Sequence, residues 1–259
     1  MLVRILTEEQ LEWLCENTPE WKANPKGGRP AADKRRTIEG IFWILDNGAK
    51  WKDLPAQYGS RATVHRWFAK WARAGVFESL MQKAGQCIEQ QGGFKLYECF
   101  VDGTFSKAKS GGDQIGLTRV GKGSKIMIMV DAHGLPVAAM SGSASPYEGH
   151  LVQRLFDFMI SSKRPERLVG DKAYDDDILA QELAEEGVEL IAPNRSNRQI
   201  KTQDGRPLRR YKRRWKVERT IAWLQHFRRL CIRWEKSNQL FQGLLHLGCC
   251  LLIISEVLR

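Results

Sequence analysis

The sequence contains no Cys-x-x-Cys pair, and its cysteines do not cluster with its histidines. Six cysteines and five histidines are spread over 259 residues, so a zinc site is not expected. A signal peptide is not predicted either, because Arg4 and Glu8 interrupt the first ten residues. The last apolar run, residues 244–258, contains His246 and Glu256 and falls short of the roughly 20 residues that span a bilayer. We therefore expect a soluble protein of the reducing cytoplasm, with a buried C-terminal helix and no membrane partner.

Acidic residues are in the minority. The chain has 30 Asp and Glu against 41 Lys and Arg, a formal net charge of +11, and 42% hydrophobic residues. That hydrophobic content is enough for the core of one larger and one smaller domain. The positive field predicts a polyanionic partner such as nucleic acid. Between residues 195 and 236, 15 Lys or Arg accompany only Asp204, Glu218 and Glu235. A carboxylate as isolated as that of Glu218 is unusual for a merely solvated helix.

Two apolar runs each end on an aspartate. Residues 97–102 end on Asp102, and residues 167–171 end on Asp171. Both runs are typical of short buried strands, and open α/β sheets bind ligands outside the carboxyl ends of their strands. The two carboxylates are therefore a candidate metal site. After the second strand, the acids at 175–177 can cap a helix.

A third candidate acid, Glu218, lies on a predicted helix. At about 100° per residue, Tyr211, Arg214 and Glu218 fall within roughly 60° of one another. One helix face therefore carries a phenol, a guanidinium and a carboxylate.

The N-terminal part is predicted to be helical. A helix over residues 33–47, a short turn and a helix over residues 61–74 have the order of a helix-turn-helix unit, whose second helix can lie in the major groove of DNA. A solvated basic face is the competing interpretation. Gly92 and Gly93 separate a helical domain, residues 1–91, from a second domain, residues 94–259. The outward side chains of the second helix are the candidate DNA contacts: Arg61, Thr63, His65, Arg66 and Lys70.

A glycine-rich loop, residues 111–123, partly matches a phosphate-binding P-loop. Gly123 stands where the pattern needs Ser or Thr, and residues 125–130 predict a strand where the pattern needs a helix. Nucleotide binding is therefore rejected. Asp131 is interpreted as a turn residue in the hairpin that follows. From residue 94 on, the predicted order is three strands, helix, strand, helix, strand, helix, which matches the mixed sheet of the ribonuclease H-like fold.

Three segments carry a resemblance to a known family. Val-Asp-Gly-Thr at 101–104, Gly-Asp-Lys-Ala-Tyr-Asp at 170–175, and the spacing of Tyr211, Arg214 and Glu218 are similar to the DDE transposases of bacterial insertion sequences, of the insertion-sequence family five type. Residues 40–77 also resemble the helix-turn-helix region of that group. The chain departs from the family at Gln225, where the family signature has lysine.

The resemblance implies an α/β fold, a ribonuclease H-like mixed sheet flanked by helices, with an N-terminal all-α helix-turn-helix domain. It implies that Asp102, Asp171 and Glu218 are catalytic and hold two Mg²⁺ ions, for which Mn²⁺ can substitute; oxygen ligands suit both. Such a site supports DNA cleavage followed by strand transfer. Tyr211 and Arg214 would contact DNA beside the cut.

The same resemblance implies double-stranded DNA partners, namely the terminal inverted repeats of the transposon and the target, and a location in the bacterial cytoplasm with the nucleoid. A homo-oligomer on DNA is expected from the need to hold two ends together. Trp13, Trp21 and Trp43 are candidate contacts for it, with core burial as the alternative. Lys172 is a candidate phosphate contact or the partner of a nearby acid.

Two other functions remain open. The first is a transposase-derived helix-turn-helix protein with an inactive catalytic domain. The second is a ribonuclease H-like nuclease that cuts DNA without joining it. The presence of all three acids favours the transposase over the inactive protein.

Overall fold

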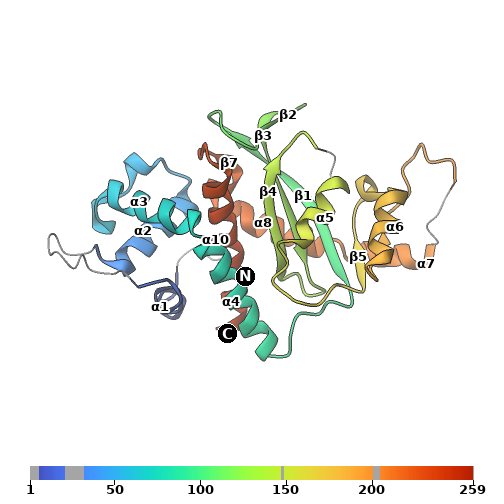
Figure 1. Cartoon of the computed structure of the whole chain (residues 1–259), viewed down its shortest axis with the longest axis horizontal. Helices are drawn as coiled ribbons and strands as arrows, with labels where there is room; N and C mark the ends of the chain where they lie inside the picture. The colour runs from blue at the N-terminus through green and yellow to red at the C-terminus, as the bar shows by residue number, and fades with distance from the viewer. Residues whose placement is uncertain (1–5, 21–31, 147–148, 201–204, 259) are drawn as a thin grey trace.

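The computed structural model describes residues 6–20, 32–146, 149–200 and 205–258. Figure 1 shows a group of N-terminal helices on one side and a sheet flanked by helices on the other, with the C-terminal helix α10 between them. One continuous hydrophobic core joins the two parts.

Four helices form the N-terminal part. Thr7 and Gln10 form a reciprocal capping box, Asp33 caps the second helix, and Gly48 ends it with φ +66°, a conformation that favours glycine. These helices agree with the sequence-based expectation, whereas the fourth helix was not predicted. The helices are α1 Glu8–Asn17, α2 Lys34–Asn47, α3 Arg61–Arg73 and α4 Val76–Gln90.

The connection between α2 and α3 is longer than predicted. It contains two short 3-10 helices, η1 Trp51–Asp53 and η2 Ala56–Tyr58, whereas a typical helix-turn-helix unit has a turn of about three or four residues. The two helices still pack against each other. The predicted unit is therefore present as two packed helices, with a longer structured link between them.

The sheet is mixed, as the ribonuclease H-like order predicts. Its strand order is β2-β3-β1-β5-β6, with β4 paired to β3 and β7 paired to β1. The pairs β1–β3, β2–β3 and β3–β4 are antiparallel, and the pairs of β5 with β1 and β6 are parallel. The strands are β1 Cys99–Ala108, β2 Gly116–Thr118, β3 Gly121–Val130, β4 Pro136–Ser143, β5 Arg167–Val169, β6 Glu189–Ile191 and β7 Ile232–Arg233.

The glycine-rich segment forms the hairpin of β2 and β3. A strand therefore begins at Gly121, where a phosphate-binding loop would lead into a helix. Asp131 is a turn residue, as expected: its carboxylate accepts hydrogen bonds from the backbone N–H groups of His133, at 2.8 Å, and Leu135, at 2.9 Å. The strand predicted over residues 125–130 and the turn predicted at Asp131 are confirmed.

The expectation that the first strand ends on Asp102 is wrong. β1 continues to Ala108, because its second half pairs with β3 as far as Lys107 opposite Gly123. The parallel neighbour β5 stops at Val169, opposite Phe100. Asp102 therefore lies inside its own strand but beyond the end of the adjacent one.

Helices that alternate with the later strands flank the sheet. α8 packs against β1 and β3, and α6 packs against β6. Asp176 caps α6 by accepting hydrogen bonds from Ile178 and Leu179, as the acids at 175–177 predicted. The elements are α5 Gly149–Phe156, η3 Lys172–Tyr174, α6 Asp177–Glu185, α7 Gly205–Leu208, η4 Arg209–Arg213, α8 Trp215–His226, α9 Arg228–Cys231 and α10 Asn238–Val257.

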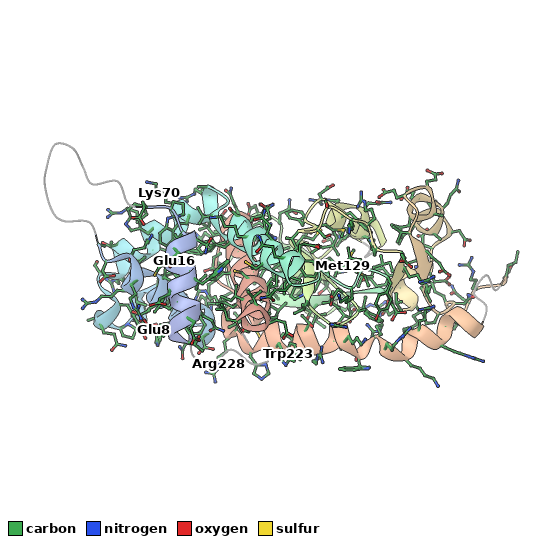
Figure 2. The ribbon with its side chains drawn as sticks, turned by 90° about the horizontal axis from the view of Figure 1, so that it is seen from below. Glu8, Glu16, Lys70, Met129, Trp223 and Arg228 are labelled. Carbon is green, nitrogen blue, oxygen red and sulfur yellow. The ribbon has the colours of Figure 1, made fainter. Side chains whose placement is uncertain are left out.

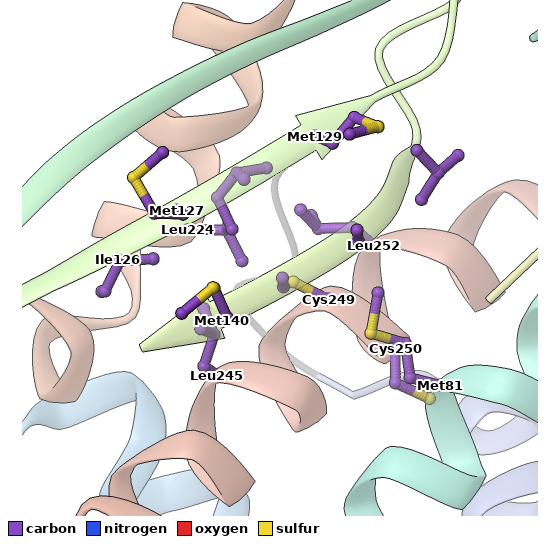
Figure 3. Close-up of a cluster of buried hydrophobic side chains, with 14 of the residues drawn as sticks. Met81, Ile126, Met127, Met129, Met140, Leu224, Leu245, Cys249, Cys250 and Leu252 are labelled. Atoms are coloured by element: carbon purple, nitrogen blue, oxygen red, sulfur yellow. The ribbon is translucent and has the colours of Figure 1, made fainter. Parts of the chain in front are cut away.

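Helix α10 joins the two parts of the molecule. It packs on β4 and on α3 and α4, and Figure 3 shows Cys249, Cys250 and Leu252 among side chains that include Met81 and Met140. The helix has 20 residues and is longer than the apolar run predicted. Its length and composition would suit a membrane span, but 83% of its most apolar window is buried inside the protein. It is a core helix, as expected.

Candidate active site

Asp102 lies inside β1, and both oxygens of its carboxylate accept hydrogen bonds. Its Oδ1 accepts a hydrogen bond of 2.8 Å from the N–H of Gly103. Its Oδ2 accepts one of 2.7 Å from Nη1 of Arg214. The side chain is 18% exposed. Asp102 is thus a largely enclosed carboxylate that is paired with the guanidinium of Arg214.

Asp171 follows the parallel neighbour strand β5. The register pairs Phe100 with Val169, and Asp102 and Asp171 each lie two residues further along. Adjacent parallel strands keep such positions side by side, so both acids reach the same region of the sheet. The Asp171 carboxylate also accepts a hydrogen bond of 2.7 Å from Ala173 N–H and caps η3.

Arg214 connects Glu218, the third predicted acid, to Asp102, the first. It is the N-cap residue of α8, its Nη2 donates to Oε1 of Glu218 one turn later, and its Nη1 donates to Asp102. Glu218 is 52% exposed, whereas Arg214 is 15% exposed. One guanidinium therefore bridges two of the three predicted catalytic carboxylates, Asp102 on β1 and Glu218 on α8.

Electrostatics couples the two aspartates. Burial raises the pKa of Asp102, Arg214 partly offsets that rise, and the charge of Asp171 raises it further. Burial disfavours a charged carboxylate, and a second carboxylate nearby disfavours it again. A site of this kind favours a bound cation, and Arg214 supplies one.

The described residues contain no group of three His, Cys, Asp or Glu side chains placed to hold a metal ion. The carboxylate of Asp102 faces Arg214 rather than a shared space with Asp171 and Glu218. The donor set is nevertheless the right one for a hard divalent ion, because it consists of carboxylate oxygens. The guanidinium stands in as the positive charge between Asp102 and Glu218, so the residues fit a cation at this position.

Glu98 is a buried anchor that the sequence did not reveal. It is fully buried just before β1, and its Oε1 accepts hydrogen bonds from Arg210, at 2.9 Å, and Arg213, at 2.6 Å. Its Oε2 has no partner. Two arginines of η4 are thereby fixed to the start of the strand that carries Asp102. A charged residue within an apolar run was the signal that could have revealed this role.

Tyr211 lies on η4 and not on the α-helix that was predicted to carry it. The 3-10 helix ends at Arg213, and α8 begins at Trp215. The guanidinium of Arg214 still lies over the Tyr211 ring, 5.6 Å from its centroid. Phenol, guanidinium and Glu218 carboxylate therefore remain neighbours, as the spacing predicted, although the backbone reaches that arrangement differently.

Helix α8 carries further side chains that were not predicted to act at the site. Gln225, which stands where the resembling family has lysine, donates a 2.8 Å hydrogen bond to Oγ1 of Thr104 on β1. Trp215 follows Arg214 and is 50% exposed. Arg219 lies over the rings of both Trp215 and Trp223. Figure 2 shows Trp223 on α8, which runs along one edge of the molecule.

The segment after Asp171 fixes a basic loop. Asp175 accepts hydrogen bonds from the N–H of Arg195, at 2.7 Å, and from Nη1 of Arg198, at 2.5 Å. Lys172 is exposed at the surface and forms no salt bridge with the residues that the structure describes. Its role as a phosphate contact stays a prediction.

The predicted DNA-contact face of α3 is only partly exposed. Arg61, Arg66 and Lys70 are exposed, whereas Thr63 and His65 are half-buried. His65 packs edge-on against Trp51 with ring centroids 4.9 Å apart, and burial lowers the pKa of His65. The positive charge on this helix therefore comes from exposed Arg61, Arg66 and Lys70, together with exposed Arg73 at its C-terminal end.

The tryptophans predicted as assembly contacts lie against the core. Trp13 and Trp43 are half-buried and pack on core residues. Trp21 lies outside the described residues. The alternative interpretation, packing on the core, holds for Trp13 and Trp43.

Comparison with known families gives two matches that together span most of the chain. Residues 6–81 match the family described as "Putative transposase of IS4/5 family". Residues 94–253 match the family described as "Transposase DDE domain". The second match includes all three predicted catalytic acids.

Individual relatives carry similar descriptions. A Burkholderia cepacia protein named "Putative transposase for insertion sequence element IS402" is 35% identical over 149 residues, 54% of this chain and 67% of the relative. A Brucella ovis protein named "Putative transposase for insertion sequence element IS6501" is 29% identical over 135 residues, 50% of this chain and 96% of the relative.

Among solved structures, the chain is similar to the piggyBac transposase in its synaptic complex with hairpin DNA. The TM-score is 0.52 at 12% sequence identity, over 98% of this chain and 74% of that one. At this identity the likeness establishes the fold, an RNase H-like sheet with helices on its faces.

Proposed function

The chain belongs to the DDE transposase family, of the IS4/5 type, and from that premise we propose that it cuts DNA at the terminal inverted repeats of an insertion sequence and joins the freed ends to target DNA. The observation that carries the proposal is the bridge of Arg214 between Asp102 and Glu218, with Asp171 just after the neighbouring strand β5. Two carboxylates far apart in sequence share one guanidinium, and the charge of Asp171 acts on the first of them.

A DDE transposase domain implies the use of divalent metal ions, and Mg²⁺ is the ion we propose. Asp102, Asp171 and Glu218 would hold it, because their oxygens suit a hard cation and leave positions for phosphate oxygens. Metal ions held by these carboxylates would supply charge stabilisation for an in-line displacement at phosphorus. The first nucleophile is water, and the second is the 3′-hydroxyl that the first cut frees.

Arg214 exchanges partners in this proposal. In the free protein it neutralises Asp102 and Glu218. With those acids neutralised by bound cations, the planar guanidinium of Arg214 would be free to bind a DNA phosphate through two parallel hydrogen bonds. Tyr211, beside it, binds the same strand through its phenol, and exposed Lys172 adds a phosphate contact.

The N-terminal helices supply the sequence-reading part. Arg61, Arg66 and Lys70 form the exposed positive edge of α3, which would enter or border the major groove. Thr63 and His65 lie deeper and contribute shape rather than charge. Two transposon ends require two catalytic centres, so the active species is a homo-oligomer assembled on DNA in the bacterial cytoplasm.

The test is cleavage of a labelled duplex that carries the terminal repeat of the element, with Mg²⁺. Wild type is expected to cut at the repeat boundary and to join a precut end to a target plasmid. Glu218→Gln should reduce cleavage by at least about 1,000-fold, because removing a carboxylate ligand forfeits several kcal/mol of transition-state stabilisation. Glu185→Gln, at an exposed acid on α6, is the matched control and should cut normally.

The outcomes separate the three classes of function. Repeat binding without cleavage by wild type, in Mg²⁺ and in Mn²⁺, would assign the chain to the inactive DNA-binding class. Cleavage without joining of a precut end would assign it to the nuclease class.

A further inference from the structure

The glycine-rich segment of the sequence builds a hairpin that the proposed function does not use. β2 and β3 pair from Gly116 opposite Gly123 to Thr118 opposite Gly121. The two-residue turn between them is Arg119 and Val120. Figure 1 draws this hairpin projecting at one end of the sheet.

The tip of the hairpin exposes apolar side chains. Leu117 is 71% exposed and Val120 is 68% exposed. Exposed cations accompany them: Arg119 in the turn and Lys122, the cross-strand partner of Leu117. Lys107 and Lys109 are exposed nearby on and after β1. None of these four cations forms a salt bridge within the part of the chain that the structure describes.

The base of the hairpin is rigidly held, which separates it from an ordinary surface loop. The guanidinium of fully buried Arg233 donates to the backbone oxygens of Asp113, at 2.8 Å, and Gln114, at 3.2 Å. A Cβ on Gly116 would lie 2.3 Å from the backbone nitrogen of Ser145, so only glycine allows this close approach. Asp113, the acid of this segment, pairs with Arg233 at 3.1 Å. The tip therefore presents positive charge without a compensating acid.

The hairpin is an extension of the strands that carry the candidate site. Asp102 pairs with Ile128 on β3, and Lys122 lies six residues before Ile128 on the same strand. At about 3.3 Å per residue, that separation is about 20 Å along the sheet. It corresponds to about six base pairs of duplex at 3.4 Å each.

We propose that the β2–β3 hairpin is a second DNA-binding element of the catalytic domain. Arg119 and Lys122 bind backbone phosphates, and Leu117 and Val120 pack on the groove wall or wedge between base pairs, about six base pairs from the cleaved phosphate. The occupant is duplex DNA rather than protein, because the unpaired charge on this tip is all positive. This inference rests on the proposed function, since it takes its position from the candidate active site.

Fluorescence anisotropy with a labelled 40-base-pair repeat duplex tests the charged pair. Arg119→Ala/Lys122→Ala should weaken binding about tenfold and reduce the slope of log K against log salt by about two, since each lost phosphate contact removes about 0.9. Lys163→Ala, at an exposed lysine that follows α5, is the charge control and should bind as wild type does.

A fluorescent base analogue tests the apolar pair. We expect 2-aminopurine about six base pairs from the cut, tested on either side of it, to brighten when wild type binds and unstacks it. Leu117→Ser/Val120→Ser should lose that signal and bind about threefold more weakly with an unchanged salt slope. Ile178→Ser, at an exposed apolar residue of α6 beside the opposite edge strand β6, is the control.

Wild-type affinity and salt slope in the charge variant, together with an unchanged signal in the apolar variant, would overturn the inference. So would hairpin variants that alter only the sedimentation of the free protein, because the hairpin would then bind a second copy of the chain. Cleavage by wild type in the same preparations keeps the proposed function separate: if it persists while the hairpin effects are absent, only this inference fails.

Discussion

Two arginine–carboxylate pairs of similar geometry have different surroundings in this molecule. Arg229 and Glu235 lie at the junction between the N-terminal helices and the sheet, with a closest contact of 2.6 Å and side chains 2% and 3% exposed. Arg214 and Asp102 lie at the candidate site, 2.7 Å apart and 15% and 18% exposed. Distance alone does not distinguish the pairs.

The other partners of each arginine distinguish them. Arg229 also donates a hydrogen bond of 2.6 Å to the backbone oxygen of Ala49. This bond fixes the end of α2 to α9, and no ligand can take its place. Arg214 binds only carboxylates and lies over a tyrosine ring. The first pair is therefore structural, and the second is exchangeable. A carboxylate that holds a metal ion during catalysis must be free to change its partner.

The largest expected difference between the pairs is in stability. Glu235→Gln leaves the Arg229 charge buried without a counter-charge, so the free energy of unfolding should fall by about 3–5 kcal/mol. The matched change Asp102→Asn should alter it by less than about 1 kcal/mol, because Arg214 keeps Glu218 and reaches solvent. Urea unfolding of both variants measures this. Equal losses in the two would mean that the Arg214 pair is structural as well.

The free energy of unfolding should also depend on pH, through a buried histidine that lies outside the candidate site. Burial lowers the pKa of His246 on α10 to about 4, and the ring contacts Gln242 and the backbone oxygen of Ala139. The folded state keeps His246 neutral while the unfolded chain takes up a proton below about pH 6.5. Stability should therefore fall by about 3 kcal/mol as the pH drops from 6.5 to 4.

Unfolding of wild type and His246→Gln at several pH values isolates this contribution, because the other titrating groups cancel in the difference. The variant should lose less stability than wild type over that range. Parallel pH profiles would show that the ring is protonated in the folded protein.

The smallest expected effect is on metal affinity, where two neighbouring arginines, Arg214 and Arg213, should differ. Arg214→Gln removes the cation that competes for Asp102 and Glu218, so Mn²⁺ should bind the DNA-free protein about tenfold more tightly. Arg213→Gln removes the same charge from a neighbour that binds Glu98 instead, and should leave the affinity unchanged. Electron paramagnetic resonance of free Mn²⁺ measures both. Unchanged or weaker binding by Arg214→Gln would refute the exchange of partners.

The sequence by itself determined the local elements and the composition of the site. Capping residues such as Thr7 and Asp33, the glycine at position 48 and the acids at 175–177 specified helix boundaries, because caps act within one helical turn. Alternating and continuous apolar runs specified most strands. The three acids and their neighbours were identifiable because their motifs are short and contiguous.

Tertiary structure decided the relations between distant segments. The pairing of β1 with β3 and β7 extends the first strand beyond Asp102, and the parallel pairing with β5 brings the segment that ends on Asp171 to the same edge. Arg214 as the bridge between Asp102 and Glu218, Glu98 as the anchor of η4 and Arg233 as the base of the hairpin all depend on contacts across more than 100 residues. Local propensity carries no information about such contacts, because burial and charge pairing are set by the assembled sheet and helices.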